Sequence, residues 1–201
     1  MHKEADVTAS IMFALIVLFC WSALFAADAT PEIPSAEPGF STSQEPREAK
    51  LGEMLMAGFQ VLDTMEHEAM MGCWNQFMGV VEQLPADPQA PYYGINFFTA
   101  DYNPQEHIGF GYMACVPVLK SEGIPEGVVL RKIPARDYIV FEHKGPLMYL
   151  EQSFNYIFNQ YLPQGKHKAL YADLLEVYDC RFDAESPDSV IEIWVPVQPK
   201  E

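Results

Sequence analysis

The sequence is poor in basic residues, and this deficit excludes one large class of partner. Only 12 lysines and arginines stand against 28 aspartates and glutamates, which gives a formal net charge of −16 at pH 7. No part of the chain gathers its basic residues into a cluster. Because such a surface repels phosphate groups, the composition predicts no nucleic-acid binding and is compatible with cationic ligands.

Cysteine and metal-binding patterns are also scarce. Beyond the N-terminal apolar run, the cysteines are Cys73, Cys115 and Cys180, at no metal-like spacing. They allow at most one disulfide within the chain, and the apolar neighbours of Cys73 and Cys115 favour buried thiols. Residues 67–71, HEAMM, begin like a zinc-protease motif but have methionine in place of the second histidine. The methionines follow the spacing of a core face, which favours packing over Cu(I) binding. The sequence therefore predicts no metal and no cofactor.

The N-terminus contains one long uncharged run. Residues 7–27 carry no charged side chain, and Ala27-Asp28-Ala29 has the small-x-small pattern of a signal-peptidase site. This predicts a signal peptide over residues 1–29 and a periplasmic or secreted protein. A run of this length can also span a bilayer, so an uncleaved membrane anchor with the body outside the cytoplasm is the alternative.

The segment after this run has the composition of a linker. Residues 28–48 hold four prolines among serine, threonine and acidic residues, and no apolar period is present. Such segments bury too little apolar surface to fold. We therefore expect a disordered, proline-rich linker over residues 30–50 and a folded domain over residues 51–201.

The folded part contains an internal duplication. WNQFM at 74–78 matches FNYIF at 154–158 with an offset of 80, and ACVPV at 114–118 matches IWVPV at 193–197 with an offset of 79. Each half reads strand, helix, strand, strand. The predicted strands are 54–62, 92–98 and 114–118 in the first half, and 137–144, 174–179 and 190–197 in the second.

The two predicted helices rest on apolar side chains that recur every three or four residues. The first helix is marked by Met70, Trp74, Phe77, Val81 and Leu84, and the second by Leu147, Leu150, Phe154, Ile157 and Tyr161. Pro146 suits the start of the second helix, and Pro85 and Pro163 are expected to end the two helices.

Two βαββ units imply an α+β fold with pseudo-two-fold symmetry. We expect an antiparallel sheet with helices on one face and a central ligand pocket between the halves, on the partly open opposite face. In the last strand, VIEIWVPV at 190–197, Glu192 and Trp194 share one face because side chains alternate along a strand. The pairing of a carboxylate with an indole on one face raises the question of which group or ligand lies against them.

The motifs DYIVFEHKGP, FNYIFNQYLP, LLEVYDCRFD and IEIWVPV together resemble the GyrI-like small-molecule-binding domain, as do YYGINFF and YMACVPV less closely. This family includes the effector-binding domains of bacterial multidrug and AraC-type transcription activators. The resemblance covers roughly residues 55–198. It implies a duplicated βαββ fold whose central pocket has aromatic walls and one buried acid, and which takes lipophilic, often cationic compounds.

The resemblance implies that Glu192, on the last strand, is the acid of that pocket. A carboxylate in an apolar pocket is relieved by a cation, and Trp194 adds cation–π attraction. The alternative places Glu192 in solvent. Glu176 and Tyr178 share one face of the preceding strand and are a second pair of candidates, unless that face is the solvated one.

Two further candidates come from the repeat and from the family pattern. The repeat puts Met113 and Cys115 where the second half has Glu192 and Trp194, so the site is expected to be asymmetric. Trp74 matches an aromatic that the family carries on its first helix, although its helical spacing fits core packing equally well.

Binding of a hydrophobic, aromatic or cationic small molecule is the predicted function. The alternative, implied by the resemblance, is hydrolysis of reactive cyclopropane-type compounds, with Glu192 as the catalytic residue. Family members also inhibit gyrase, but export would separate the protein from that partner. Haem proteins share the fold, yet no histidine stands at an obvious axial position.

Overall fold

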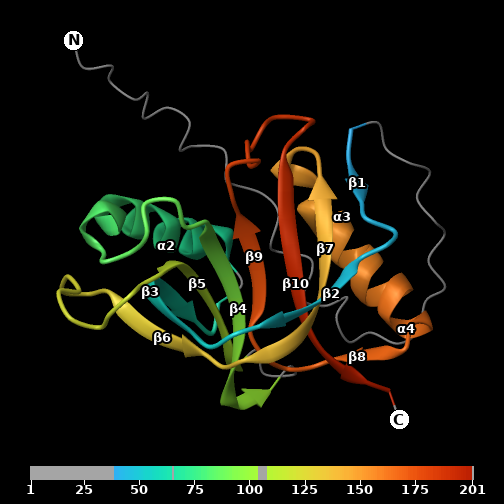
Figure 1. Ribbon diagram of the computed structural model, residues 1–201, viewed down its shortest axis with the longest axis horizontal. Coiled ribbons are helices and arrows are strands. Elements are labelled where there is room, and N and C mark those ends of the chain that lie inside the picture. The colour runs from blue at the N-terminus through green and yellow to red at the C-terminus, as the bar shows by residue number, and fades with distance from the viewer. Residues whose placement is uncertain (1–38, 65, 104–107, 201) are drawn as a thin grey trace.

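The molecule is built on one large antiparallel sheet backed by helices (Figure 1). A computed structural model describes residues 39–64, 66–103 and 108–200. Ten strands form the sheet in the order β1-β7-β10-β9-β4-β5-β3-β6, with β2 also paired to β7 and β8 to β10. Their bounds are β1 Ser41–Thr42, β2 Arg47–Leu51, β3 Met54–Leu62, β4 Tyr92–Asn103, β5 Ile108–Pro117, β6 Val129–Ile133, β7 Arg136–Lys144, β8 His167–Ala169, β9 Leu174–Tyr178 and β10 Val190–Pro199.

The order of the strands confirms the predicted duplication. From edge to centre, one half runs β3-β5-β4 and the other runs β7-β10-β9. The halves meet where β4 pairs with β9, with Ile95 opposite Leu175, so the symmetry axis passes through this central pair. Trp74 and Phe154, which the offset of 80 matched, lie on the helices of their respective halves.

Each half also contributes a strand that the sequence did not predict. β2 precedes β3 in the chain but pairs with β7 of the other half, and β6 precedes β7 but pairs with β3. The two strands start 82 residues apart, as do β3 and β7, so the duplicated unit is ββαββ with its first strand exchanged.

The predicted linker is therefore wrong over its described part. Residues 41–42 and 47–51 form β1 and β2 rather than disordered chain. The sequence REAKL has only Ala49 and Leu51 to bury, and its backbone hydrogen bonds to the edge of β7 order it instead. Residues 1–38, with the predicted signal segment, lie outside the described residues. Within the described ranges, no helix is long and apolar enough to cross a membrane.

The helices follow the predicted periodicity. α2 spans His67–Val80 and buries Met70, Trp74 and Phe77, after which a short 3-10 turn covers Val81–Gln83. The second helical segment begins with a 3-10 turn at Leu147–Tyr149 and continues as α3, Leu150–Tyr156. A π-helical turn, Ile157–Tyr161, then leads into α4, Leu162–Gln164. Pro163 lies inside α4 rather than beyond it, because a proline is tolerated in the first turn of the segment that restarts after the π turn.

Both faces of the sheet are covered, which corrects the expectation of an open face. The helices and the larger apolar cluster cover one face, which we call the helix face; it includes Ala114, Ile191, Ile193 and Val195. A second cluster with Met56, Ile95, Phe97, Tyr138 and Leu175 covers the opposite face. Figure 1 shows β2 and β6 crossing in front of that opposite face, where Ala49, Leu51 and Val129 pack against the second cluster.

A buried polar chain holds β1 against the second helix. The Ser153 hydroxyl lies 2.6 Å from the Thr42 hydroxyl and 2.7 Å from His143 Nδ1, and all three side chains are buried. The ring of Phe40 stacks on His143 and on Tyr149. Burial lowers the pKa of His143, and hydrogen bonds with the backbone of Pro146 and Gly145 offset only part of this effect.

This histidine predicts a loss of stability in mild acid. Its folded-state pKa lies below the ordinary value of 6.5, so its contribution is complete above pH 6.5 and disappears as the pH falls through the lowered pKa. The free energy of unfolding should therefore fall more steeply between pH 7.5 and 5 in the wild type than in His143→Asn. A His167→Asn control should keep the steep slope, whereas parallel curves for wild type and His143→Asn would contradict the assignment.

Candidate functional site

The register of the central strands divides the predicted site residues between the two faces. Glu192 of β10 lies opposite Val177 of β9, and Ile193 lies opposite Glu176. Side chains directly opposite each other in an antiparallel pair share a face. Glu192 and Trp194 therefore point away from the helices, whereas Glu176 points toward them.

The remaining candidates separate in the same way. Trp74 and Tyr178 belong to the apolar cluster on the helix face, together with Ile193. Met113 belongs to the cluster on the opposite face, where Trp194 packs against it. The structure divides the six predicted residues into two groups, one on the helix face with Glu176, Tyr178 and Trp74 and one on the opposite face with Glu192, Trp194 and Met113.

Glu192 is an ion-paired carboxylate. Arg47 Nη2 donates to Oε2 at 2.8 Å and Arg181 Nη2 to Oε1 at 3.1 Å, while the Trp194 indole N–H donates to Oε2 at 2.9 Å. Arg47 also lies over the Trp194 ring, 4.9 Å from its centroid. Burial raises the pKa of Glu192, but the hydrogen bonds from Trp194, Arg181 and Arg47 outweigh it and the pKa is lowered.

Glu192 and Trp194 face the basic side chain of Arg47, which comes from the strand β2 that the sequence had assigned to a disordered linker. Glu192 also contacts Arg181, which lies in the loop after β9. Arg47 pairs with this carboxylate alone, and Arg181 shares its charge between Glu192, Asp179 and Glu142, so Glu192 is already an ion-paired group. The expectation that Glu192 is the pocket acid is not supported by this geometry.

Glu176, in contrast, is surrounded by neutral donors. Its side chain is 1% exposed. Asn96 Nδ2 donates to Oε1 at 2.9 Å, and the hydroxyls of Tyr178 and Tyr112 donate to Oε2 at 2.8 and 3.2 Å. The Tyr112 oxygen in turn accepts the Trp74 indole N–H at 2.9 Å. We call Glu176, Asn96, Tyr112, Tyr178 and Trp74 the acid cluster.

The acid cluster combines residues from four elements. Trp74 comes from α2, Asn96 from β4, Tyr112 from β5, and Glu176 and Tyr178 from β9, so the cluster lies at the junction of the two halves. The Trp74 and Tyr178 rings meet edge to face, with centroids 5.2 Å apart. The result is a carboxylate with an aromatic surround on the helix face.

The charge of this carboxylate has no cationic partner within 4.0 Å among the described residues. Burial raises the pKa of Glu176, and the hydrogen bonds from Tyr178, Asn96 and Tyr112 lower it only in part. A carboxylate offers about four lone-pair sites, of which three are taken. The group is therefore suited to accept a positive charge, or to hold a proton more readily than an ordinary glutamate does.

Gly94 makes the cluster possible. It lies opposite both Ala114 and Glu176 in the sheet, and a Cβ at this position would collide with the Tyr112 hydroxyl and lie 2.6 Å from Glu176 Oε2. Gly94, Asn96 and Tyr112 were not predicted as site residues from the sequence. A glycine inside a strand marks a close approach of other groups, so Gly94 in YYGINFF was the available signal.

Comparison with known proteins identifies the family. The model of the GyrI-like small molecule binding domain matches residues 44–198. The chain belongs to the GyrI-like family. The match begins 11 residues before the resemblance seen in the sequence and so includes the exchanged strand β2.

Individual relatives are distant from this GyrI-like chain. The transcriptional regulator BrlR of Pseudomonas aeruginosa is 32% identical over 89 residues, 44% of this chain and 33% of the regulator. The chain thus spans about a third of that curated relative. An integron cassette protein from Vibrio cholerae has a similar structure, with a TM-score of 0.57 and 21% identity over 79% of this chain and 99% of that one.

Two further structures share the fold. SAV2435, solved bound to tetraphenylphosphonium, has a TM-score of 0.62 and 21% identity, covering 77% of this chain and 94% of that chain. A hydrolase from Listeria innocua has a TM-score of 0.51 and 9% identity, covering 79% and 94%. At these identities the likeness establishes the α+β fold and not the ligand or reaction.

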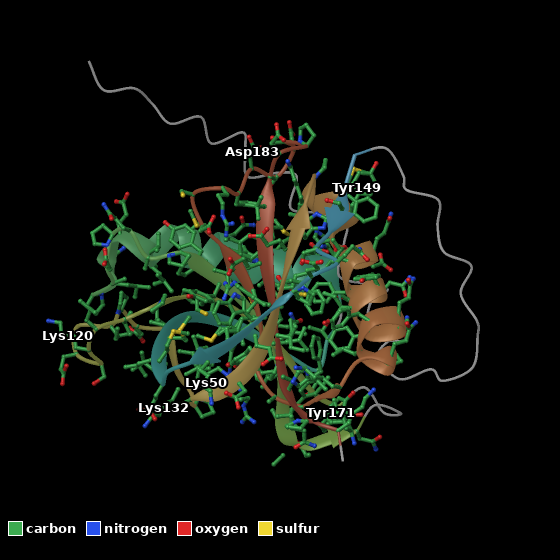
Figure 2. All side chains as sticks on the ribbon, turned by 45° about the vertical axis from the view of Figure 1, so that its right-hand side comes forward. Lys50, Lys120, Lys132, Tyr149, Tyr171 and Asp183 are labelled. Atoms are coloured by element: carbon green, nitrogen blue, oxygen red, sulfur yellow. The ribbon has the colours of Figure 1, made fainter. Side chains whose placement is uncertain are left out.

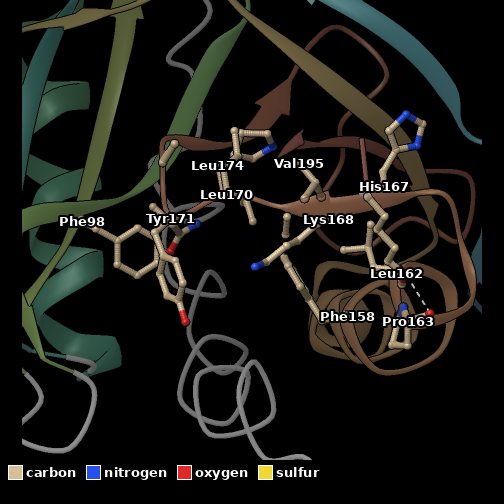
Figure 3. A pocket seen from close by; sticks show the side chains of 15 residues that line it. Phe98, Phe158, Leu162, Pro163, His167, Lys168, Leu170, Tyr171, Leu174 and Val195 are labelled. Carbon is tan, nitrogen blue, oxygen red and sulfur yellow. Dashed lines mark hydrogen bonds between the residues drawn. The ribbon is translucent and has the colours of Figure 1, made fainter. Parts of the chain in front are cut away.

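A cavity of about 400 Å³ lies beside the acid cluster (Figure 3). Its apolar wall includes Phe98, Phe158, Leu162, Leu174 and Val195. Asn96 lines the same cavity, so one amide contacts both the cavity and Glu176. Tyr171 also lines this cavity and lies toward the lower end of the molecule in Figure 2.

The other sequence motifs carry no site in the described part of the chain. His67 begins α2, and within the described ranges no group of three or more His, Cys, Asp or Glu side chains is placed to hold a metal ion. Cys73 and Cys115 are buried thiols as predicted, Cys180 is exposed, and none of the three forms a disulfide.

Proposed function

We propose that this GyrI-like chain binds lipophilic organic cations, with Glu176 as the counter-charge. The observation that carries the proposal is a 1% exposed carboxylate that three neutral donors hold in place and that no described cation neutralises. SAV2435, which shares the fold, was solved with the lipophilic cation tetraphenylphosphonium, and this supports the same chemical class here.

The energetics favour a cation over a neutral ligand of the same shape. An ionised carboxylate buried without a counter-ion is costly, and a bound cation removes that cost while gaining charge-assisted attraction. The Trp74 and Tyr178 rings, which pack edge to face, give this carboxylate an aromatic surround. Glu192 is less suited to this role, because Arg47 already pairs with it and Arg181 bridges it to two other carboxylates.

Hydrolysis of a reactive lipophilic compound is the second candidate. The raised pKa of Glu176 suits a proton donor, because a general acid works best when its pKa is close to the working pH. The lowered pKa of Glu192 does not, so the catalytic group of this alternative would be Glu176. Recovery of the bound compound unchanged after prolonged incubation would favour binding over hydrolysis.

We also propose that binding takes place outside the cytoplasm. This proposal rests only on the uncharged run at residues 7–27 and the Ala27-Asp28-Ala29 pattern. The mass of the native protein tests it, since cleavage would leave a chain beginning near Thr30 and a retained Met1 in a soluble cytoplasmic fraction would contradict it.

A matched pair of ligands tests the preference for charge. Methyltriphenylphosphonium and triphenylphosphine oxide have nearly the same shape, but only the first is a cation. Calorimetric titration should show the cation binding about 10- to 100-fold more tightly, because only the cation gains the charge-assisted interaction. Equal affinities for the two compounds would contradict the proposal.

A further inference from the structure

The cavity beside α4 has a counterpart in the other half of the molecule. A second cavity of about 400 Å³ lies at the end of α2 and is lined by Val81, Leu84 and Val116 among others. Val116 matches Val195 of the first cavity through the repeat offset of 79. The bridge between Ala86 and Val118 likewise matches the pairing of Ala169 with Val197. The two cavities therefore occupy equivalent places in the duplicated fold, and we call them the α4 cavity and the α2 cavity.

The two cavities differ in charge. Among the described residues, the α2 cavity is lined by Glu82 and Asp87 and by no basic residue. The charged or titratable residues that line the α4 cavity are His167, Lys168 and Lys200, and no acidic residue of the described ranges joins them. In a chain with 28 acidic and 12 basic residues, a cavity with only basic charges reverses the balance of the whole molecule. The α2 cavity occupies the equivalent place in the repeat and is lined by acidic residues, so the fold itself does not require the basic lining of the α4 cavity.

Lys168 is the cation of the α4 cavity that is available to a ligand. The Lys200 amino group donates to the carbonyl oxygens of Leu162 and Pro163, and His167 lies 3.8 Å from Glu48. The backbone of Lys168 pairs with Gln198 of β10, whereas its amino group has no hydrogen bond or ion pair with the described part of the chain. Figure 3 shows its side chain reaching into the cavity between Phe158 and Tyr171.

The π-helical turn shapes the apolar wall of this cavity. Up to Ile157 the second helix keeps the offset of 80 from α2, and the π turn Ile157–Tyr161 then adds a residue to the turn. Phe158 lies in this turn and Leu162 follows it, and both side chains line the cavity. Turns of this kind are frequent at functional sites, and the corresponding part of α2 has none.

We propose that the α4 cavity binds an amphiphilic carboxylate, with the acid group at Lys168 and the hydrocarbon tail against Phe158, Leu162, Leu174 and Val195. The volume of about 400 Å³ lies within the range of small-molecule sites. A lysine at the mouth of an apolar cavity supplies a charge-assisted contact for the head while the tail leaves water. This site uses a different charged group from the proposed cation site, Lys168 in place of Glu176, and it does not rest on the proposed binding of cations, although Asn96 adjoins both.

Calorimetric titration with decanoate tests the site in the purified protein. Lys168→Gln should weaken decanoate binding about three- to tenfold, a reduction limited by the exposure of the lysine to solvent. Binding of 1-decanol, which has the same tail without the charge, should be unchanged. Lys166→Gln is the matched control, because Lys166 is paired with Glu48 and does not line the cavity, and it should bind decanoate like the wild type.

Two results would overturn this assignment. One is equal decanoate affinity in wild type and Lys168→Gln. The other is loss of decanoate binding in Glu176→Gln, which would place the ligand at the acid cluster. Retained decanoate binding in Glu176→Gln, together with loss of phosphonium binding, would support two separate sites. Retained decanoate binding in a protein that binds no phosphonium would support the α4 cavity and contradict only the cation site.

Discussion

Glu176→Gln is expected to weaken the binding of methyltriphenylphosphonium by about 10- to 100-fold. The substitution keeps the size of the side chain but removes its charge, which costs the roughly 1.5–3 kcal/mol of a charge-assisted interaction. Triphenylphosphine oxide, the neutral analogue, should lose much less. The measurement is a calorimetric titration of both ligands against wild type and variant.

Glu192→Gln is the matched control for this experiment. It removes the same charge from a carboxylate on the opposite face, where Arg47 and Arg181 are its partners. Phosphonium affinity should stay within about twofold of the wild type, since Glu192 points away from the helix face and is already ion-paired with Arg47. A larger loss in Glu192→Gln than in Glu176→Gln would reverse the assignment of the pocket acid.

In the absence of ligand, the stability of Glu176→Gln as a function of pH gives a second test. The pKa of Glu176 in the folded protein is raised above its ordinary value of 4.5. The wild type is therefore penalised as the pH rises from that value through the raised pKa, whereas a glutamine is not. The free energy of unfolding of Glu176→Gln relative to wild type should increase with pH across this window.

Gly94→Ala is expected to have the second large effect, on both binding and stability. Its new methyl group would occupy the space of the Tyr112 hydroxyl and lie 2.6 Å from Glu176 Oε2. The cluster must then move, which should cost about 1–3 kcal/mol in the free energy of unfolding, as overpacking does elsewhere. Because Glu176 would lose its positioning donors, phosphonium affinity should fall about tenfold or more.

Gly72→Ala provides the comparison for this substitution. Gly72 lies within α2 and a Cβ there would meet nothing within 4 Å. Alanine should therefore stabilise the protein by about 0.5–1 kcal/mol, since glycine is unfavourable inside a helix, and should leave ligand binding unchanged. Wild-type phosphonium affinity in Gly94→Ala would show that the ligand does not depend on the acid cluster.

The fold was largely predictable because each copy of the repeat shows the short-range apolar periodicity of its strands and helices. Period-two strands and helices with apolar residues every three or four positions are visible in the sequence, and the two copies reinforce each other. The exchanged strands were not predictable in this way. REAKL, at 47–51, has a weak apolar pattern, and its order comes from backbone hydrogen bonds to β7, a strand about 90 residues away in the chain.

The candidate site was predictable only in part, and Glu192 shows why. Its neighbours in the sequence are apolar, which suggested an acid without a partner. Its actual partner Arg47 lies 145 residues upstream, in a segment whose composition indicated disorder. Asn96 and Tyr112 were missed for the same reason, since the contacts that give them a role join strands 64 to 80 residues apart.

The sequence by itself determined which side chains share a face within each strand. Alternation placed Glu192 with Trp194 and Glu176 with Tyr178, and the structure keeps both pairs. Which pair meets the helices was decided only by the tertiary structure, because this depends on the register that sets Ile193, and not Glu192, opposite Glu176. A shift of one residue in that register would exchange the two faces. The register is fixed by hydrogen bonds between distant strands and by the packing of α2 and α3. Neither contribution can be read from the local sequence of β9 or β10.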